Sequence, residues 1–171
     1  CRKLGMLAWR RGDFLEAERN YKESIRIAKS LGEKRPTAAT AMNLGVLEHI
    51  CGKTVDAERL FTEALTIFEE LGDLQGVGEC LGNLAITAEG MGRWDEAASM
   101  HRRVLGIWRQ LGKPSYIQYS GYLLTLLQAV RGETPDLSVV KEVQVLAEQL
   151  NSPSARAFAA QTAVLSYPQS E

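Results

Sequence analysis

The stretch that decides the fold runs from residue 44 to residue 72 and reads LGVLEHICGKTVDAERLFTEALTIFEELG. Residues 4–32 and residues 84–112 are copies of it, placed forty residues before and forty residues after, without a gap. The positions shared by all three copies are, in the middle one, Leu44, Gly52, Ala57, Ile67, Leu71 and Gly72. A fixed period near forty residues predicts a solenoid of stacked repeats.

Each copy has the pattern of two helices that run antiparallel. The apolar residues Leu44, Leu47 and Cys51 form one helical stripe that stops at Gly52. A second run of apolar residues, spaced by three and four, then continues until Gly72. The small side chain of Ala57 is what a closely crossed helix pair requires.

The order of leucine-glycine, glycine, alanine and an aromatic residue resembles the tetratricopeptide repeat. The resemblance covers about residues 1–150 and is to the forty-residue variety found in kinesin light chains and in the sensor arms of bacterial signalling ATPases and transcription regulators. It implies an all-α, right-handed superhelical solenoid of antiparallel helix pairs that binds other proteins on its concave face.

On this basis we expect a single array over residues 1–171 with about four repeats and a terminal helix. The expected repeats are residues 1–32, 33–72, 73–112 and 113–151, and the expected capping helix covers residues 152–166. The chain begins at Cys1 rather than at a methionine, so we expect it to be a piece of a longer protein.

Several details of the expected helices follow from the pattern. We expect Leu4 and Leu7 of the first helix to point inward, and residues 32–37 to form a long link. The fourth repeat is divergent, because Leu137 and Lys141 replace the small and the aromatic residue of the other copies. Its second helix should have Thr134 as its cap and Pro135 at its first position. Trp94 and Trp108 are expected to be the large packing residues of the third repeat.

Composition and charge exclude several classes of partner. The 20 basic and 21 acidic residues give a net charge of −1, without the cationic excess that nucleic-acid binding needs. No apolar run approaches the roughly 18 residues that a membrane span requires. We therefore expect neither nucleic acid nor a membrane as a direct partner.

The three cysteines, Cys1, Cys51 and Cys80, are odd in number and show no CxxC spacing. This predicts neither a disulfide framework nor a zinc site. Reduced cysteines that serve as small apolar residues are typical of a cytoplasmic protein.

Nothing in the sequence predicts an enzyme, a metal site or a cofactor. There is no glycine-rich phosphate loop, no nucleophile elbow and no catalytic pair of carboxylates. His101 aligns with Tyr21 and Phe61, so it should fill the gap between helices, and His49 has no neighbour at a metal-ligand spacing.

Asn43 and Asn83 are the main candidates for partner binding. In the repeats that this chain resembles, an asparagine immediately before the leucine-glycine pair lines the concave groove. Its amide offers both a donor and an acceptor, so it can bind the main chain of a peptide. The alternative is that these amides bridge adjacent repeats. Lys3 and Leu123 occupy the equivalent positions of the first and fourth repeats, so at most two asparagines can bind the main chain of a peptide in this way.

Residues three or four positions away from the asparagines share their helical face. This places the remaining candidates in the groove: Met42, Val46, His49, Ile86, Glu89, Tyr119, Tyr122 and Leu126. Such a mostly apolar lining suits a peptide with hydrophobic anchors. Only Arg2 and Lys3 approximate the carboxylate clamp of chaperone-binding members, so we do not expect a chaperone tail as the ligand.

Gly76, Gly78 and Gly82 lie inside a predicted helix, where each costs up to about 1 kcal/mol relative to alanine. The close approach of a neighbouring helix and that of a ligand backbone both explain glycine at these positions.

The sequence thus predicts a scaffold that binds a peptide or a partner domain in its groove. By the family resemblance it would be the sensor or regulatory arm of a larger signalling protein, and the partner could be another domain of the same parent chain. The alternative is an oligomerisation or structural spacer module, in which an exposed apolar face of the array docks on itself.

Overall fold

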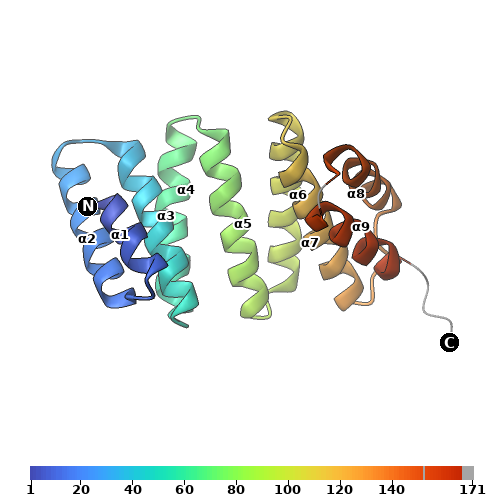
Figure 1. The fold of residues 1–171 in the computed structure, drawn as a ribbon, viewed down its shortest axis with the longest axis horizontal. Coiled ribbons are helices and arrows are strands. Elements are labelled where there is room, and N and C mark those ends of the chain that lie inside the picture. The colour runs from blue at the N-terminus through green and yellow to red at the C-terminus, as the bar shows by residue number, and fades with distance from the viewer. Residues whose placement is uncertain (152, 167–171) are drawn as a thin grey trace. The chain divides into compact units, whose positions relative to one another are not determined.

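The computed structural model describes residues 1–151 and 153–166, and these residues form nine α-helices and no strand (Figure 1). In chain order the helices are α1 (Arg2–Arg10), α2 (Phe14–Ser30), α3 (Lys34–Ile50), α4 (Thr54–Glu70), α5 (Leu74–Gly90), α6 (Trp94–Gln110), α7 (Pro114–Val130), α8 (Leu137–Leu150) and α9 (Pro153–Ser166). The predicted all-α architecture of consecutive helical repeats followed by a terminal helix is confirmed.

The helices from α2 to α7 are 17 residues long and are joined by three-residue links. The middle residue of each link is a glycine with φ between +59° and +78°, a left-handed conformation that closes the preceding helix. The expected long link at residues 32–37 is wrong, because α3 already begins at Lys34. The extra length of the forty-residue repeat therefore lies entirely in its helices.

Residues 1–91 form one compact unit in which each helix from α1 to α5 packs against the next. Ala17 and Ala57 have no exposed surface. A Cβ built at Gly45 would lie 2.7 Å from the ring of Phe61, and one built at Gly5 would lie 2.6 Å from the ring of Tyr21. The first helix of a repeat thus presents bare backbone to an aromatic ring of the second helix.

The first helix of this unit does not bury its leucines as predicted. Leu4 and Leu7 are 56% and 48% exposed, whereas the equivalent Leu44 and Leu47 are only 3% and 2% exposed. Among the described residues, α3 packs closely against both α2 and α4, whereas α1 packs closely against α2 alone. Leu4 and Leu7 have the same local pattern as Leu44 and Leu47, so the difference in exposure follows from the smaller number of helices that pack against α1.

The second compact unit begins at residue 92, and its described residues are 92–151 and 153–166. His101 is 1% exposed, as expected for a side chain that fills the interior, and Trp108 is 2% exposed. Trp94, the other tryptophan expected to pack, is 42% exposed at the first position of α6, and Phe14 at the first position of α2 is similarly 39% exposed.

The divergent fourth repeat differs from the predicted geometry. Helix α8 begins at Leu137 with Asp136 as its N-cap, so Thr134 is not the cap and Pro135 is not the first helical residue. Val143 of α8 takes the place of the missing aromatic side chain, and a Cβ built at Gly121 of α7 would lie 2.7 Å from it.

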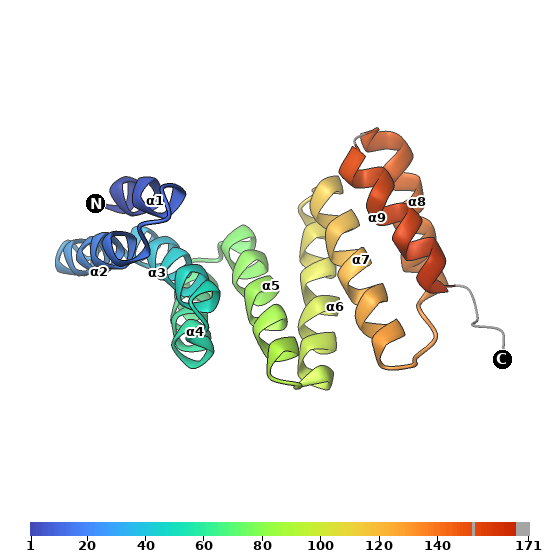
Figure 2. The ribbon, with the colours of Figure 1, turned by 60° about the horizontal axis from the view of Figure 1, so that its bottom comes forward.

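Helix α9 packs against both α7 and α8 (Figure 2). The buried amide of Gln118 in α7 holds this arrangement, because its Nε2 donates to the carbonyl oxygens of Val143 (3.3 Å) and Ala155 (2.9 Å). The helix begins at Pro153, close to the predicted start, and Ser152 lies outside the described residues.

Among residues 1–151 and 153–166, no helix has the combination of length and apolar character that a bilayer span demands.

Candidate partner-binding site

The first helices of the second and third repeats carry the same pattern of partial exposure. In both, the half-buried positions fall at intervals of three and four residues, so they line one face of the helix. We call this face of α3 and α5 the first-helix strip; it consists of Ala39, Met42, Asn43, Val46 and His49 on α3 and of Glu79, Gly82, Asn83, Ile86 and Glu89 on α5. All other faces of these two helices are mostly buried along their middle turns.

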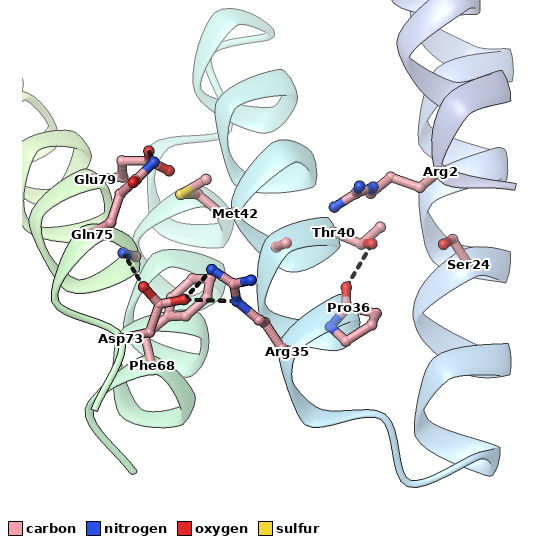
Figure 3. Close-up of a pocket in the computed structure, with 12 residues that line it drawn as sticks. Arg2, Ser24, Arg35, Pro36, Thr40, Met42, Phe68, Asp73, Gln75 and Glu79 are labelled. Carbon is pink, nitrogen blue, oxygen red and sulfur yellow. Dashed lines mark hydrogen bonds and ion pairs between the residues drawn. The ribbon is translucent and has the colours of Figure 1, made fainter. Parts of the chain in front are cut away.

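A cavity of about 490 Å³ lies at the N-terminal ends of the strip, between α1, α3 and α5 (Figure 3). Ala39, Met42 and Glu79 of the strip line it, together with the buried ring of Phe68. This volume is within the range of about 300–1,000 Å³ that is usual for ligand sites.

Gly76 and Gly82 of α5 have different surroundings. One fits the close approach of a neighbouring helix, and the other fits the approach of a ligand backbone. A side chain at Gly76 would collide with the ring of Phe68, so this glycine permits the close approach of α4. A Cβ at Gly82 would meet no atom within 4 Å. Gly82 therefore leaves an opening on the strip, at the position that Met42 fills on α3.

The two asparagines lie on the strip and differ in their bonds. The Nδ2 of Asn83 donates to the carbonyl oxygen of Glu79 in its own helix, at 3.0 Å. Asn43 is half-buried and makes no side-chain hydrogen bond to any residue that the structure describes. Within the same residues, neither amide bonds to a neighbouring repeat.

Val46, His49, Ile86 and Glu89 lie further along the strip, and all four are partly exposed. The Nδ1 atom of His49 is buried, and no described residue hydrogen-bonds to it. No group of three or more His, Cys, Asp or Glu side chains within the described ranges could hold a metal ion.

Tyr119, Tyr122 and Leu126 occupy the equivalent positions on α7, in the unit formed by residues 92–171. The rings of both tyrosines pack on Phe158 of α9, with centroid distances of 5.6 Å and 5.0 Å. Helix α9 therefore contacts both tyrosines, although Tyr119 remains 41% exposed, and the repeat pattern of α7 did not reveal this contact.

The sequence pattern missed the polar wall of the cavity. Arg35 at the start of α3 donates from Nε to Oδ2 of Asp73 at 2.8 Å, and its Nη2 lies 2.8 Å from the same oxygen. Asp73 is also the N-cap of α5, because its Oδ1 accepts from the backbone N–H of Gly76 at 3.1 Å. Burial acts to raise the pKa of Asp73, but the bonds from Gly76 and Arg35 outweigh it, so the pKa is lowered.

Comparison with known proteins gives one matching family. Residues 36–110 match the family model described as tetratricopeptide repeat. None of the curated proteins matches the sequence.

Several solved structures have the same fold. One contains the nearly identical TPR-like repeats of a kinesin light chain candidate from Podosopora anserina, with 15% identity and a TM-score of 0.76 over 96% of this chain and 82% of that chain. Another is the Rap conjugation gene regulator of plasmid pLS20 in complex with a Phr peptide, with 16% identity and a TM-score of 0.66 over 95% of this chain and 50% of that chain.

A third is aspartyl phosphate phosphatase F from Bacillus subtilis, with 16% identity and a TM-score of 0.68 over 96% of this chain and 48% of that chain. The chain thus spans about half the length of the regulator and of the phosphatase. At these identities the likeness establishes the fold alone.

Proposed function

Because residues 36–110 match the tetratricopeptide repeat family, we propose that the first-helix strip and the adjoining cavity bind a peptide or a partner protein. The observation that carries the proposal is the strip itself. Half-buried positions recur at the same places on α3 and α5, and they adjoin a cavity of about 490 Å³. A surface that combines accessible apolar side chains with polar groups and lies next to a ligand-sized cavity is suited to anchoring side chains of a partner.

The amides of Asn43 and Asn83 would bind the main chain of that partner. Asn43 has both its donor and its acceptor available, and Asn83 keeps its oxygen available while its nitrogen bonds to Glu79. Gly82 adds an opening through which a peptide backbone approaches the helix.

In a larger protein we propose that the array acts as a sensor or regulatory arm rather than as an enzyme. Support comes from the resemblance to such arms and from a regulator of the same fold that was solved with a peptide bound. No catalytic role is proposed, because His49 is the only His or Cys on the strip and its buried Nδ1 has no hydrogen-bond partner among the described residues.

A glycine variant tests the strip without weakening the fold. Gly82→Leu adds a side chain at an open position, and leucine favours a helix by up to about 1 kcal/mol over glycine. Peptides are first selected from a random display library on the immobilised 171-residue protein, and their affinities are then measured by fluorescence anisotropy. We expect Gly82→Leu to raise the melting temperature and to weaken peptide binding about tenfold or more.

Gly106→Leu is the matched control. Gly106 is also helical and has no atom within 4 Å of a built Cβ, but it lies on the exposed face of α6. It should raise the melting temperature without changing the affinity. Equal affinities for both variants would show that the selected peptides bind elsewhere.

The asparagines are tested by the double variant Asn43→Ala and Asn83→Ala. Loss of two bonds to a peptide main chain should weaken binding by about tenfold or more, since each hydrogen bond contributes about 1 kcal/mol. The melting temperature should stay almost the same. A large loss of stability with unchanged affinity would instead support a bridging role for these amides.

Self-association is the second candidate function, and the exposed side chains of Leu4 and Leu7 favour it. Static light scattering over a concentration series separates the two. A scaffold stays monomeric, whereas an oligomerisation module shows a growing dimer fraction that Leu4→Ser with Leu7→Ser abolishes.

A further inference from the structure

The cavity beside the first-helix strip has walls of opposite charge. Helix α1 contains Arg2, Lys3 and Arg10 and no acidic residue. Helix α5 contains Glu79 and Glu89 and no Lys or Arg. Both helices line the same cavity, Arg2 from one side and Glu79 from the other.

The wall between them is electrically balanced. Lys34 and Arg35 of α3 are each paired with a carboxylate, Lys34 with Glu70 and Arg35 with Asp73, both at 2.8 Å. Their charges are therefore largely compensated within the protein. What α3 offers to the cavity is mostly apolar, with Met42 lying between Arg2 and Glu79 in the view of Figure 3.

The two charges on the outer walls are not compensated in this way. Arg2 has no ion pair and no hydrogen bond to the residues that the structure describes, and its side chain points from α1 toward the cavity (Figure 3). Glu79 accepts one hydrogen bond, at 3.0 Å, from the neutral amide of Gln75. One positive and one negative group thus face the cavity across an apolar floor.

We propose that the cavity takes a peptide segment in which an apolar side chain lies between a carboxylate and a cation, with the carboxylate at Arg2 and the cation at Glu79. The apolar side chain rests on Met42, Ala39 and the ring of Phe68. Opposite charges at the two walls attract the matching ends of such a segment, repel the reversed arrangement and so fix the direction of the peptide. This inference rests on the proposed function, because it specifies the ligand of the same strip.

The probes are heptapeptides with an acetylated N-terminus and an amidated C-terminus, labelled for fluorescence anisotropy. The dipolar probe carries Glu near one end, Lys near the other and Leu and Phe between them. Three matched probes replace Glu, Lys or both by Gln. Because a carboxylate can also come from a chain end, a fifth probe replaces the Glu side chain by a free C-terminal carboxyl group.

We expect each charge of the dipolar probe to tighten binding to the wild-type protein about threefold relative to the probe with Gln at that position, because exposed ion pairs contribute modestly. Arg2→Gln should abolish the preference for Glu and keep that for Lys. Glu79→Gln should do the reverse. Lys29→Gln and Glu16→Gln, which change exposed charges on α2, are the matched controls and should keep both preferences. High salt should reduce both preferences.

The outcomes separate this inference from the proposed function. If the uncharged probe binds as tightly as the dipolar one, and Gly82→Leu still weakens it, the strip binds peptides but the charge pattern is wrong. The same holds if Arg2→Gln or Glu79→Gln leaves the corresponding preference intact. If no probe binds, or if Gly82→Leu has no effect on any of them, both the inference and the proposed function are wrong.

Discussion

Glycine and ring pairs determine how closely the helices of a repeat approach each other. Gly5 faces Tyr21 and Gly45 faces Phe61, sixteen residues apart in both cases, and neither glycine leaves room for a methyl group. An alanine in an open helix position is stabilising, but here it has to displace an aromatic ring that is at most 1% exposed.

Gly45→Ala should therefore destabilise the protein. The built Cβ lies 2.7 Å from Phe61, and overpacking of this kind costs about 1–3 kcal/mol, more than the gain of up to about 1 kcal/mol in helix propensity. Gly106→Ala is the control, because its Cβ meets nothing within 4 Å and it should stabilise. Urea unfolding followed by circular dichroism measures both, and equal signs would contradict the expectation.

The three cysteines should differ in reactivity toward thiol reagents. Burial raises the pKa of Cys80 to about 12 and leaves it no exposed surface, whereas Cys1 and Cys51 are exposed. Only a thiolate reacts, so we expect two thiols to react in the native protein at mildly alkaline pH and the third to react on unfolding. A Cys80→Ala variant should keep both fast-reacting thiols; a loss of one of them would show that Cys80 is accessible.

Single residues show where prediction from the sequence succeeds and where it fails. Ala57 and His101 were placed correctly in the interior because the forty-residue spacing fixes their helical face. Leu4 has the same pattern as Leu44 but is exposed, since burial depends on what packs against the helix. Arg35 and Asp73 meet across 38 positions, a contact that helical periodicity cannot predict.

At the level of elements, Asp73 joins the start of α5 to the start of α3. Asp73→Ala removes both the N-cap and the ion pair with Arg35, and loss of an N-cap alone costs about 1 kcal/mol. We expect a loss of about 1–2 kcal/mol in the free energy of unfolding. Asp13→Ala is the comparison, because Asp13 caps α2 through the N–H of Glu16 (2.9 Å) but forms no ion pair with the residues that the structure describes, and it should cost less.

The contribution of Asp73 should also depend on pH. Its pKa is lowered in the folded state from an ordinary value of 3.8, so its stabilising effect is fully present above that value. The effect is lost as the pH falls through the lowered folded-state pKa. Unfolding curves of wild type and Asp73→Ala should therefore converge in acid, and a constant difference down to the lowest accessible pH would contradict this.

The helices of the first three repeats follow the sequence pattern, but α8 does not. A threonine and proline at positions 134 and 135 have the composition of a helix start, yet the helix begins two residues beyond the proline. Asp136 provides a better cap, because its carboxylate accepts from both the N–H (2.8 Å) and the hydroxyl (2.7 Å) of Ser138. Local composition predicted roughly where the link before α8 ends, but it could not decide between Thr134 and Asp136 as the N-cap.

For the whole molecule, the even balance of 20 basic and 21 acidic residues predicts weak binding to nucleic acid. Such binding depends on the number of phosphates that cations neutralise. We expect no mobility shift of a DNA duplex at physiological salt, with a basic DNA-binding domain as the positive control. A shift that is abolished by Arg10→Gln together with Arg11→Gln would show that the basic residues at the end of α1 bind DNA despite the balanced net charge.

The site was only partly accessible to prediction. Adding three or four residues to Asn43 and Asn83 gives the half-buried face of α3 and α5, because a helix repeats its faces at that spacing. The opposite charges of α1 and α5 become a property of one cavity only when the chain is folded. The packing of Phe158 on Tyr119 and Tyr122 likewise depends on where α9 lies against α7.

The seven left-handed glycines from Gly12 to Gly132 follow one another at steps of twenty residues. A gene that duplicates or deletes a forty-residue block between two equivalent glycines in the range from Gly12 to Gly112 therefore joins the same three-residue link to the next helix. Such an event changes the number of repeats without creating a new kind of link between helices. Related genes can therefore differ in the number of repeats while each remaining link keeps its conformation.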